Sequence, residues 1–366
     1  MIVKELKLKN FRNYEEEIFE FDDKINIIHG SNAQGKTNIL EAIYYFSFGK
    51  SQRAKKDAEI INFSKDYASM NIVFKDEKRE NTAEVNIFKN KKKSISVNDI
   101  SIKKNSELVG KFSGIYFGPE YLELIKGAPK VRRKNTDIII SQLKPAYFSA
   151  LSDMRKILEQ KSSLLKSEKP DKITLEILNE KLLDITAYIA KKRFFYLKKI
   201  EEKAAILQKT ISFEKENFEI NYISPIGHIE EFEEKSFKEK FRKKIEENFQ
   251  REILFKECKI GPQRDEIEYK INGLDAKSYG SQGQQKTAVL VQKIAEVELF
   301  KEEKGEYPVL LLDDIMSELD KSRQEFVIDK IKNMQIFITS TEKESFEKFK
   351  RGKYFEISGG RLLKSF

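Results

Sequence analysis

Apolar residues along this chain follow two kinds of pattern, one with a period of two and one with helical spacing. Alternation over residues 6–14 predicts a strand that ends in a turn. Three further alternating runs, at 68–74, 83–87 and 95–97, predict antiparallel strands, the last two joined through a turn at 90–92. The N-terminal third is therefore expected to carry an antiparallel sheet.

Helical spacing takes over between about 145 and 250. The leucines and isoleucines at 175, 178, 182, 185 and 189 are three or four positions apart, which is an a/d seam with charged residues around it. An earlier helix over 151–165 fits the same seam, a breaker follows at 167–171, and a further helix is predicted over 237–249. The seam covers about two or three heptads, so it predicts a short helical lobe rather than a long coiled-coil rod.

A glycine-rich segment lies between a predicted buried strand at 24–29 and a predicted helix that begins at 38. In such a loop the backbone amides surround phosphate groups at the N-terminus of the helix. Lys36 is expected to reach the β- and γ-phosphates, and Thr37 to ligate Mg²⁺. A chance glycine-rich turn is the alternative, and the strand–loop–helix setting favours a nucleoside triphosphate site. The segment is Gly30, Ser31, Asn32, Ala33, Gln34, Gly35, Lys36 and Thr37, a complete G-x-x-x-x-G-K-[ST] motif.

A second buried strand is predicted over 307–312, and it ends in Asp313 and Asp314. Mg²⁺ prefers hard oxygen ligands at the end of such a strand, so Asp313 is a candidate metal ligand and Asp314 a candidate general base. A solvated acidic turn is the alternative. The strand at 335–338 ends in hydroxyl residues at 339–341, where a related ATPase commonly has a histidine, and a hydroxyl there is expected to contact the γ-phosphate.

Residues 280–284 have the form of an ABC-type signature, with Gln282 in place of the first glycine of the pair. Ser281, Gly283 and Gln284 at the start of a predicted helix make a second anion site. A chain with both a phosphate loop and a signature usually cannot bring them together on one nucleotide. The pattern therefore predicts a composite site and an ATP-dependent homodimer.

The composition of the chain indicates the cellular compartment and whether a membrane partner is expected. The chain has 366 residues, one cysteine (Cys258), no apolar stretch of membrane-spanning length and no secretory signal pattern. A soluble protein of a reducing cytoplasm, without a membrane partner, is expected.

The net charge of +9 is concentrated in clusters. The lysines at 89–93 are most simply an ordinary solvated loop. Two other basic clusters lie close to the nucleotide motifs in sequence. We expect them to form a positively charged surface that binds a polyanion, and solvated loops are the alternative. Their candidate DNA-binding residues are Lys50, Arg53, Lys55, Lys56, Lys130, Arg132 and Arg133.

Together these motifs resemble the RecF family, in the SMC/Rad50-like branch of the ABC ATPases. The resemblance covers nearly the whole chain in order, with two departures: Gln263 stands where the family commonly has histidine, and 134–137 reads Lys-Asn-Thr-Asp where Phe-Leu-Asp is usual. The matching stretches are 8–14, 30–37, 127–133, 261–265, 281–285 and 312–320.

The resemblance implies an α/β fold: an ABC-type P-loop ATPase head with a mixed sheet, an antiparallel insertion and a short helical second lobe. The expected segments are 1–145 and 256–366 for the head and 146–255 for the helical lobe. It also implies ATP-dependent dimerisation on gapped or ss/dsDNA-junction DNA, partnership with RecR and RecO, and loading of RecA in recombinational repair, replication and the SOS response. Hydrolysis is expected to be slow and to act as a switch.

Three rivals are weaker than an ATP-gated DNA clamp. A transporter ATPase is disfavoured by the long separation between Thr37 and Ser281 and by the unexplained helical segment. A nuclease of the OLD type would carry a metal-dependent catalytic domain after the ATPase. This chain shows no constellation of carboxylates for such a domain after Asp320. A structural SMC protein would require a far longer coiled coil.

Overall fold

The chain leaves one compact unit and later returns to it. In the computed structural model, which describes residues 1–341 and 352–365, Met1–Tyr121 and Glu296–Phe366 form the first unit, and Leu122–Ala295 form the second. The expected segment boundaries at 145 and 255 lie inside the second unit, because helix α4 (Pro129–Leu143) and strand β11 (Glu266–Ile271) pack there.

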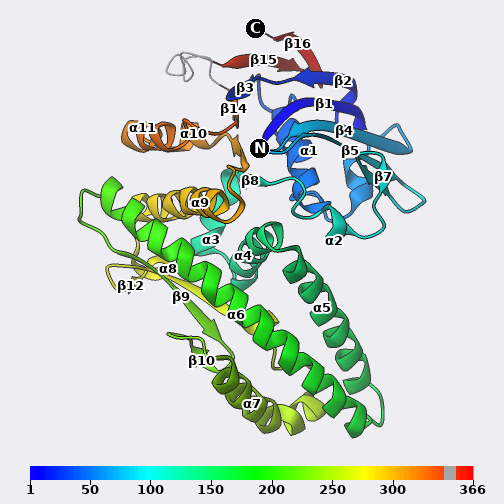
Figure 1. Ribbon diagram of the computed structural model, residues 1–366, viewed down its shortest axis with the longest axis vertical. Helices are drawn as coiled ribbons and strands as arrows, with labels where there is room; N and C mark the ends of the chain where they lie inside the picture. Colours follow the sequence, from blue (N-terminus) through cyan, green and yellow to red (C-terminus); the bar gives the residue numbers. More distant parts are fainter. Residues whose placement is uncertain (342–351, 366) are drawn as a thin grey trace. The chain divides into compact units, whose positions relative to one another are not determined.

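An antiparallel sheet with strand order β2-β1-β4-β5-β6-β7 forms one layer of the first unit (Figure 1). The predicted antiparallel strands and the turn between β5 and β6 are confirmed, because alternate residues of β4 and β5 are buried. The strands are β1 (Ile2–Phe11), β2 (Tyr14–Glu20), β4 (Tyr67–Lys75), β5 (Glu80–Phe88), β6 (Ser94–Val97) and β7 (Ile100–Ser101).

A second sheet of this unit has the order β16-β15-β3-β14-β13-β8. From β15 to β8 all neighbours are parallel, and only β16 is antiparallel. The predicted strands at the phosphate loop, at the two aspartates and before the hydroxyl residues are confirmed, whereas β8, β15 and β16 were not predicted. The strands are β3 (Ile25–His29), β8 (Gly114–Phe117), β13 (Val309–Asp313), β14 (Ile336–Ser340), β15 (Lys353–Ser358) and β16 (Arg361–Ser365).

Short helical elements complete the described part of the first unit. The longest is α1, which follows the glycine-rich loop and is buried over most of its length. The elements are α1 (Lys36–Phe48), η1 (Asp57–Ile60), α2 (Asn105–Leu108), η2 (Pro119–Leu122, which ends at the boundary of the units), α10 (Ile315–Glu318) and α11 (Lys321–Lys330).

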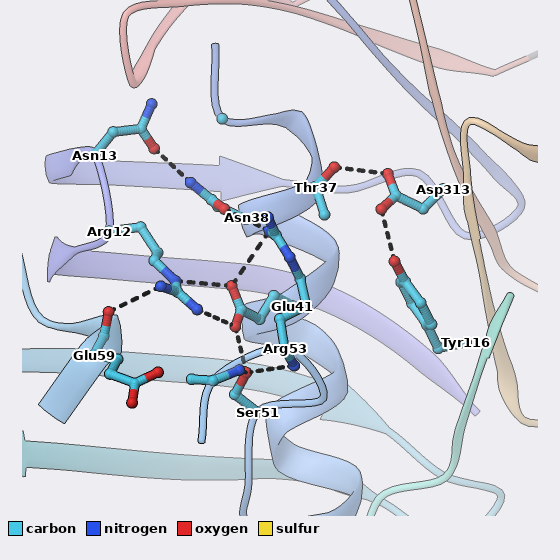
Figure 2. A network of polar contacts seen from close by, with 12 residues as sticks. Arg12, Asn13, Thr37, Asn38, Glu41, Ser51, Arg53, Glu59, Tyr116 and Asp313 are labelled. Carbon is cyan, nitrogen blue, oxygen red and sulfur yellow. Dashed lines mark hydrogen bonds and ion pairs between the residues drawn. The ribbon is translucent and has the colours of Figure 1, made fainter. Parts of the chain in front are cut away.

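Helix α1 is tied to the β1–β2 turn by a buried carboxylate. Glu41 is fully buried, and the Arg12 guanidinium donates to both of its oxygens at 3.0 and 2.7 Å (Figure 2). The Ser51 hydroxyl donates to the same carboxylate, and Arg12 also donates to the Glu59 carbonyl at 2.8 Å. A buried carboxylate requires such partners, so this contact fixes α1 against the turn.

The second unit is built on two long helices, α5 (Pro145–Leu165) and α6 (Lys172–Ile211), which lie side by side (Figure 1). The predicted seam is confirmed, because Leu175, Leu182 and Ile189 are fully buried. The predicted breaker is also confirmed: α6 begins after Asp171, whose side chain accepts from the amides of the first turn. None of the described helices is long and apolar enough to cross a lipid bilayer.

A four-stranded sheet, β10-β9-β11-β12, packs with these helices. The expectation of a wholly helical segment from 145 to 250 is wrong at β9, where Phe218, Ile220 and Tyr222 alternate and are buried. The alternating residues 266–271 form β11, and the Asn272-Gly273 turn joins β11 to β12. The remaining elements are α3 (Glu123–Lys126), α7 (Glu234–Phe255), β9 (Phe218–Ser224), β10 (Gly227–His228), η3 (Pro262–Arg264), β12 (Leu274–Asp275), α8 (Ala276–Tyr279) and α9 (Gln282–Lys304), which continues into the first unit.

An ion cluster joins five segments inside the second unit. Arg193 of α6 is almost fully buried and donates to both oxygens of Asp137 of α4, at 3.0 and 2.9 Å. Its other terminal nitrogen donates to Asp265, just before β11, at 2.5 Å. The Tyr222 hydroxyl of β9 donates to Asp265 at 2.6 Å, and Tyr147 of α5 donates to Asp137 at 2.6 Å. Helices and sheet are thereby held to one guanidinium.

The substitution Arg193→Leu is expected to lower the free energy of unfolding by about 3–5 kcal/mol, because it leaves two carboxylates without their buried cation. Urea denaturation followed by circular dichroism measures this. Lys191→Leu is the matched control: Lys191 pairs with Glu234 on the surface, with both side chains about half exposed, and its loss should change stability by less than about 1 kcal/mol. Equal effects of the two variants would contradict the assigned role of the cluster.

The substitution Glu41→Gln keeps the shape of the side chain but removes the charge that Arg12 faces. We expect a loss of about 1.5–3 kcal/mol in the free energy of unfolding, since hydrogen bonds to a charged group are replaced by weaker ones. Thermal denaturation measures it. The control is Glu16→Gln, whose side chain is 71% exposed opposite Lys9; a Glu41→Gln protein as stable as this control would show that the buried contact contributes nothing.

Candidate nucleotide site

The glycine-rich loop connects β3 to α1 and has a backbone that only some residues can adopt. Gly35 has a φ of 116°, and a Cβ at this position would lie within 2.9 Å of the Asn13 side chain and the Tyr14 hydroxyl. Only glycine fits this position. The loop is therefore shaped by contact with the β1–β2 turn as well as by its own sequence.

Two residues of that turn hydrogen-bond to the loop. The Asn13 side-chain amide donates to the Gln34 carbonyl at 2.8 Å, and the Tyr14 hydroxyl donates to the Gly35 carbonyl at 3.1 Å. The Gly360 amide, between β15 and β16, also donates to the Gln34 carbonyl at 3.0 Å. Residues 8–14 are one of the stretches that resemble the RecF family, and the sequence alone assigns them no role. In the structure, Asn13 and Tyr14 of this stretch support the glycine-rich loop.

Lys36 begins α1 and turns back over its own loop. Its Nζ donates to the carbonyls of Gly30 and Ser31 at 2.8 and 3.0 Å, and only 4% of the residue is exposed. Burial lowers the pKa of Lys36, while the nearby carboxylates of Asp314 and Asp313 oppose this shift. The Lys36 ammonium group, which is expected from the sequence to bind phosphate, here donates its hydrogen bonds to carbonyls of the loop.

Asp313, at the end of β13, accepts three hydrogen bonds from hydroxyl groups. Thr37 donates to Oδ1 at 2.9 Å, Thr339 donates to Oδ1 at 2.7 Å, and Tyr116 donates to Oδ2 at 2.7 Å. Figure 2 shows the Thr37 and Tyr116 contacts on either side of the carboxylate. These groups meet because β3, β14, β13 and β8 are parallel, which brings their carboxyl ends to one edge of the sheet.

Tyr116 was missed by sequence reasoning because its strand was not predicted. The short buried run at 114–117, followed by Gly-Pro, is the signal that would have located it. Burial raises the pKa of Tyr116 well above its ordinary value, and the Asp313 carboxylate adds to the shift. Tyr116 is therefore a permanent donor to Asp313.

Asp314 follows in a left-handed conformation, with a φ of 52°. Its amide donates to the Thr339 hydroxyl at 2.9 Å, so Thr339 bridges the two aspartates. Burial raises the pKa of Asp314, Lys36 opposes the shift, and Asp313 adds to it. Thr339 itself is fully buried, and its hydroxyl contacts both aspartates. The expected γ-phosphate contact from a hydroxyl at 339–341 stays a prediction.

The donors around Asp313 fit a magnesium ion. The Thr37 hydroxyl and the Asp313 carboxylate are hard oxygen ligands only 2.9 Å apart. Mg²⁺ usually takes one or two protein oxygens and completes its shell with water and phosphate oxygens, so no larger carboxylate cluster is needed.

Ser281 caps the N-terminus of α9, a helix of 23 residues in which Gln284 occupies the third position. The Ser281 amide donates to Gln284 Oε1 at 2.9 Å, and the Gln284 amide donates to Ser281 Oγ at 3.2 Å, which is a reciprocal capping box. Ser281 is exposed, and Gly283 is partly exposed. Gln284 is engaged further, because its Nε2 donates to Glu216 at 3.0 Å.

The basic candidates differ in exposure. Lys50, Arg53, Lys55 and Lys56 are exposed in the first unit, and Lys130 is exposed at the start of α4 in the second.

Arg132 is a correction: it is 6% exposed, and its guanidinium donates to both oxygens of Glu266 at 2.8 and 2.9 Å, so it holds α4 to β11. Arg133 is half-buried and donates to the Asp265 carbonyl at 2.5 Å. Both arginines therefore have partners within the second unit.

Known proteins resemble this chain over its full length. Residues 2–358 match the family model of the RecF/RecN/SMC N terminal domain. A DNA replication and repair protein RecF from Clostridium acetobutylicum is 39% identical over 365 residues, which are 99% of each chain. The protein of the same description from Alkaliphilus oremlandii is 42% identical over 350 residues, 96% of each chain.

Solved structures of known proteins also resemble this chain. The recombination mediator protein RecF-ATP in the RecFOR pathway is 36% identical and superposes with a TM-score of 0.93, covering all of this chain and 97% of that one. An SMC head bound to the C-winged helix domain of ScpA is 16% identical, with a TM-score of 0.57 over 100% of this chain and 98% of that one, and shares the fold. The chain therefore belongs to the RecF family and has the fold of an SMC-type ABC ATPase head.

Proposed function

We propose that this chain is an ATP-gated DNA clamp of recombinational repair. One observation carries the proposal: the phosphate loop, Lys36, Thr37 and the two aspartates meet at one sheet edge, in a family with a member solved with ATP. ATP would bind with its phosphates along residues 30–37. Lys36 would then exchange its contacts with the Gly30 and Ser31 carbonyls for phosphate oxygens.

Thr37 and Asp313 would hold Mg²⁺. The bound ion supplies charge neutralisation for the β- and γ-phosphates. Tyr116 and Thr339 keep the Asp313 carboxylate in position, because their hydrogen bonds to it do not involve the Thr37 hydroxyl. Asp314, next to Asp313 at the end of β13, would accept a proton from the attacking water. Its side chain is one methylene shorter than glutamate, so we expect slow turnover that acts as a timer.

The nucleotide site would be completed by a second copy of the chain. Ser281 is exposed at the start of a long helix, where the helix dipole and amide groups favour an anion. Ser281, Gly283 and Gln284 of one copy would close over ATP held by the loop of the other. Binding at this position requires Gln284 to release Glu216 or to use its backbone alone.

A DNA surface on the first unit would be formed by Lys50, Arg53, Lys55 and Lys56, and Lys130 of α4 would be a separate candidate contact on the second unit. Arg132 is left out of it because Glu266 neutralises its guanidinium. Contacts to phosphate dominate such a surface, so gapped or ss/dsDNA-junction substrates would be held with little sequence preference. Cooperation with RecR and RecO to load RecA onto single strands is part of the same proposal, and it rests on family membership.

The substitution Ser281→Arg is expected to abolish ATP-induced dimers, because a bulky cation would occupy the place of the γ-phosphate. Sedimentation with and without ATP and Mg²⁺ measures the dimer, and binding of a fluorescent ATP analogue should persist, since the variant retains its own loop. The control is Ser101→Arg on β7, an exposed serine in the first unit. A Ser281→Arg protein that dimerises with ATP as the control does would refute the composite site.

The triple variant Arg53→Gln, Lys55→Gln, Lys56→Gln should bind duplex DNA more weakly and with a flatter salt dependence. Each lost phosphate contact lowers the slope of log K against log salt concentration by about 0.9, so we expect a drop of roughly 2–3. Fluorescence anisotropy of a labelled duplex over a salt series measures the slope.

A variant with the same loss of charge on α7 is the control for this experiment. Lys240, Lys243 and Arg251 are exposed there, and changing all three to glutamine should leave the slope nearly unchanged. An equal loss of slope in both variants would mean that net charge, rather than this surface, governs DNA binding.

A further inference from the structure

Phe63 is the most exposed large apolar side chain among the described residues, at 101% of its reference area. It lies between η1 and β4, in the first unit. An exposed phenylalanine costs free energy in water and is therefore informative when the backbone that presents it is well ordered.

The turn that carries Phe63 is fixed by hydrogen bonds. Asn62 Oδ1 accepts from the Ser64 amide at 3.2 Å and from the Ser64 hydroxyl at 3.0 Å, and the Asn62 carbonyl accepts from the Lys65 amide at 2.9 Å. The Asn62 amide donates to the Asn10 carbonyl of β1 at 2.8 Å. An asparagine turn anchored to a central strand thus holds the ring away from the protein.

The base of the turn is secured at a second point. The Arg12 amide donates to the Ile60 carbonyl at 2.8 Å, and Phe11 and Ile61 form an isolated antiparallel bridge. The same β1–β2 turn supports the nucleotide loop through Asn13 and Tyr14.

Exposed lysines lie close to Phe63 in sequence. Lys65 follows the ring, and Lys55 and Lys56 precede it in the same connection, all exposed. At the start of β4 the Tyr67 ring lies 6.5 Å from that of Phe88 on β5, the strand beside it, and Lys91 lies 3.9 Å from the Phe88 ring centroid.

The acidic groups nearby are partly paired: Asp66 with Lys89 at 3.3 Å, and Asp57 with Lys93 at 2.9 Å. The surface therefore offers aromatic faces among positive charges, which is complementary to a single strand of nucleic acid.

We propose that Phe63 is a stacking platform for an unpaired base. This inference rests on the proposed DNA-binding function and adds to it the element that reads single-stranded character. Lysine ammonium groups would neutralise the flanking phosphates, and the phenyl ring would cover one face of the base. In the interior of a duplex both faces of each base are already stacked, so the ring could enter there only by unstacking a step. The ring therefore favours the unpaired side of a gap or junction.

The absence of tryptophan from the sequence gives a direct test. In F63W the indole is the only one in the protein, and base stacking quenches its fluorescence. We expect saturable quenching with single-stranded oligothymidylate and none with a blunt duplex. The matched reporter is I100W on β7, at a position that is 72% exposed, and its emission should not change with either DNA.

Affinity gives a second readout. Phe63→Ala should weaken binding of a labelled single strand by about tenfold or more, as expected for one lost stacking contact, while Phe63→Tyr should retain it. Affinity for a blunt duplex should be equal in all three proteins. Anisotropy of the labelled DNA measures binding independently of the tryptophan signal.

The outcomes separate the two proposals. If F63W binds single strands by anisotropy without quenching, or if Phe63→Ala binds them as the parent does, the stacking role is overturned and the clamp proposal stands. If neither the parent protein nor any variant binds DNA, the clamp proposal fails and this inference fails with it. An F63W emission that shifts with a protein partner but not with DNA would assign the ring to a protein interface and overturn the nucleic-acid assignment.

Discussion

The parallel register of β3, β14, β13 and β8 is the constraint on which the candidate site depends. It brings four carboxyl ends to one edge, so that a buried carboxylate, Asp313, can be satisfied entirely by hydroxyl groups from Thr37, Thr339 and Tyr116. Neutral donors stabilise the carboxylate without cancelling its charge. The full negative charge therefore remains available to a cation, and Thr37 is the one donor of the three that would leave Asp313 when a metal ion binds.

The groups assigned to nucleotide are already engaged within the protein. Lys36 contacts loop carbonyls, Thr37 contacts Asp313, and Gln284 contacts Glu216. Binding would exchange these hydrogen bonds rather than add to them, so the net gain per contact is smaller than a count of new bonds implies. The loop is also held in shape by hydrogen bonds from Asn13 and Tyr14, which limits the ordering that a ligand must impose.

Sequence reasoning located the groups whose chemistry has a fixed spacing, and it missed those that act through tertiary contact. The phosphate loop, Asp313 and the seam of α6 each have a local pattern. Tyr116 reaches Asp313 across 197 positions of sequence, and no local pattern encodes that distance. Arg132 was misjudged for the same reason: in sequence it is one more cation in a basic run, but Glu266 on a distant strand neutralises and buries it. Strand β9 shows a third limit, because its alternation is short and lies between two long helical patterns.

In the sequence, the second unit is inserted between the two parts of the first unit. This order determines which sheets a growing chain can complete on the ribosome. Strands β1, β2 and β4–β7 are all present once residue 101 has emerged, so that sheet can pair early. Strand β3 cannot: its neighbours, β14 and β15, are translated last. At ordinary elongation rates Ile27 and Ile28 of β3 wait roughly 15–60 s for their partners, and in that time they are exposed to chaperones and proteases. Truncated products that stop before residue 336 contain the whole glycine-rich motif and yet have no completed sheet on which to hold it.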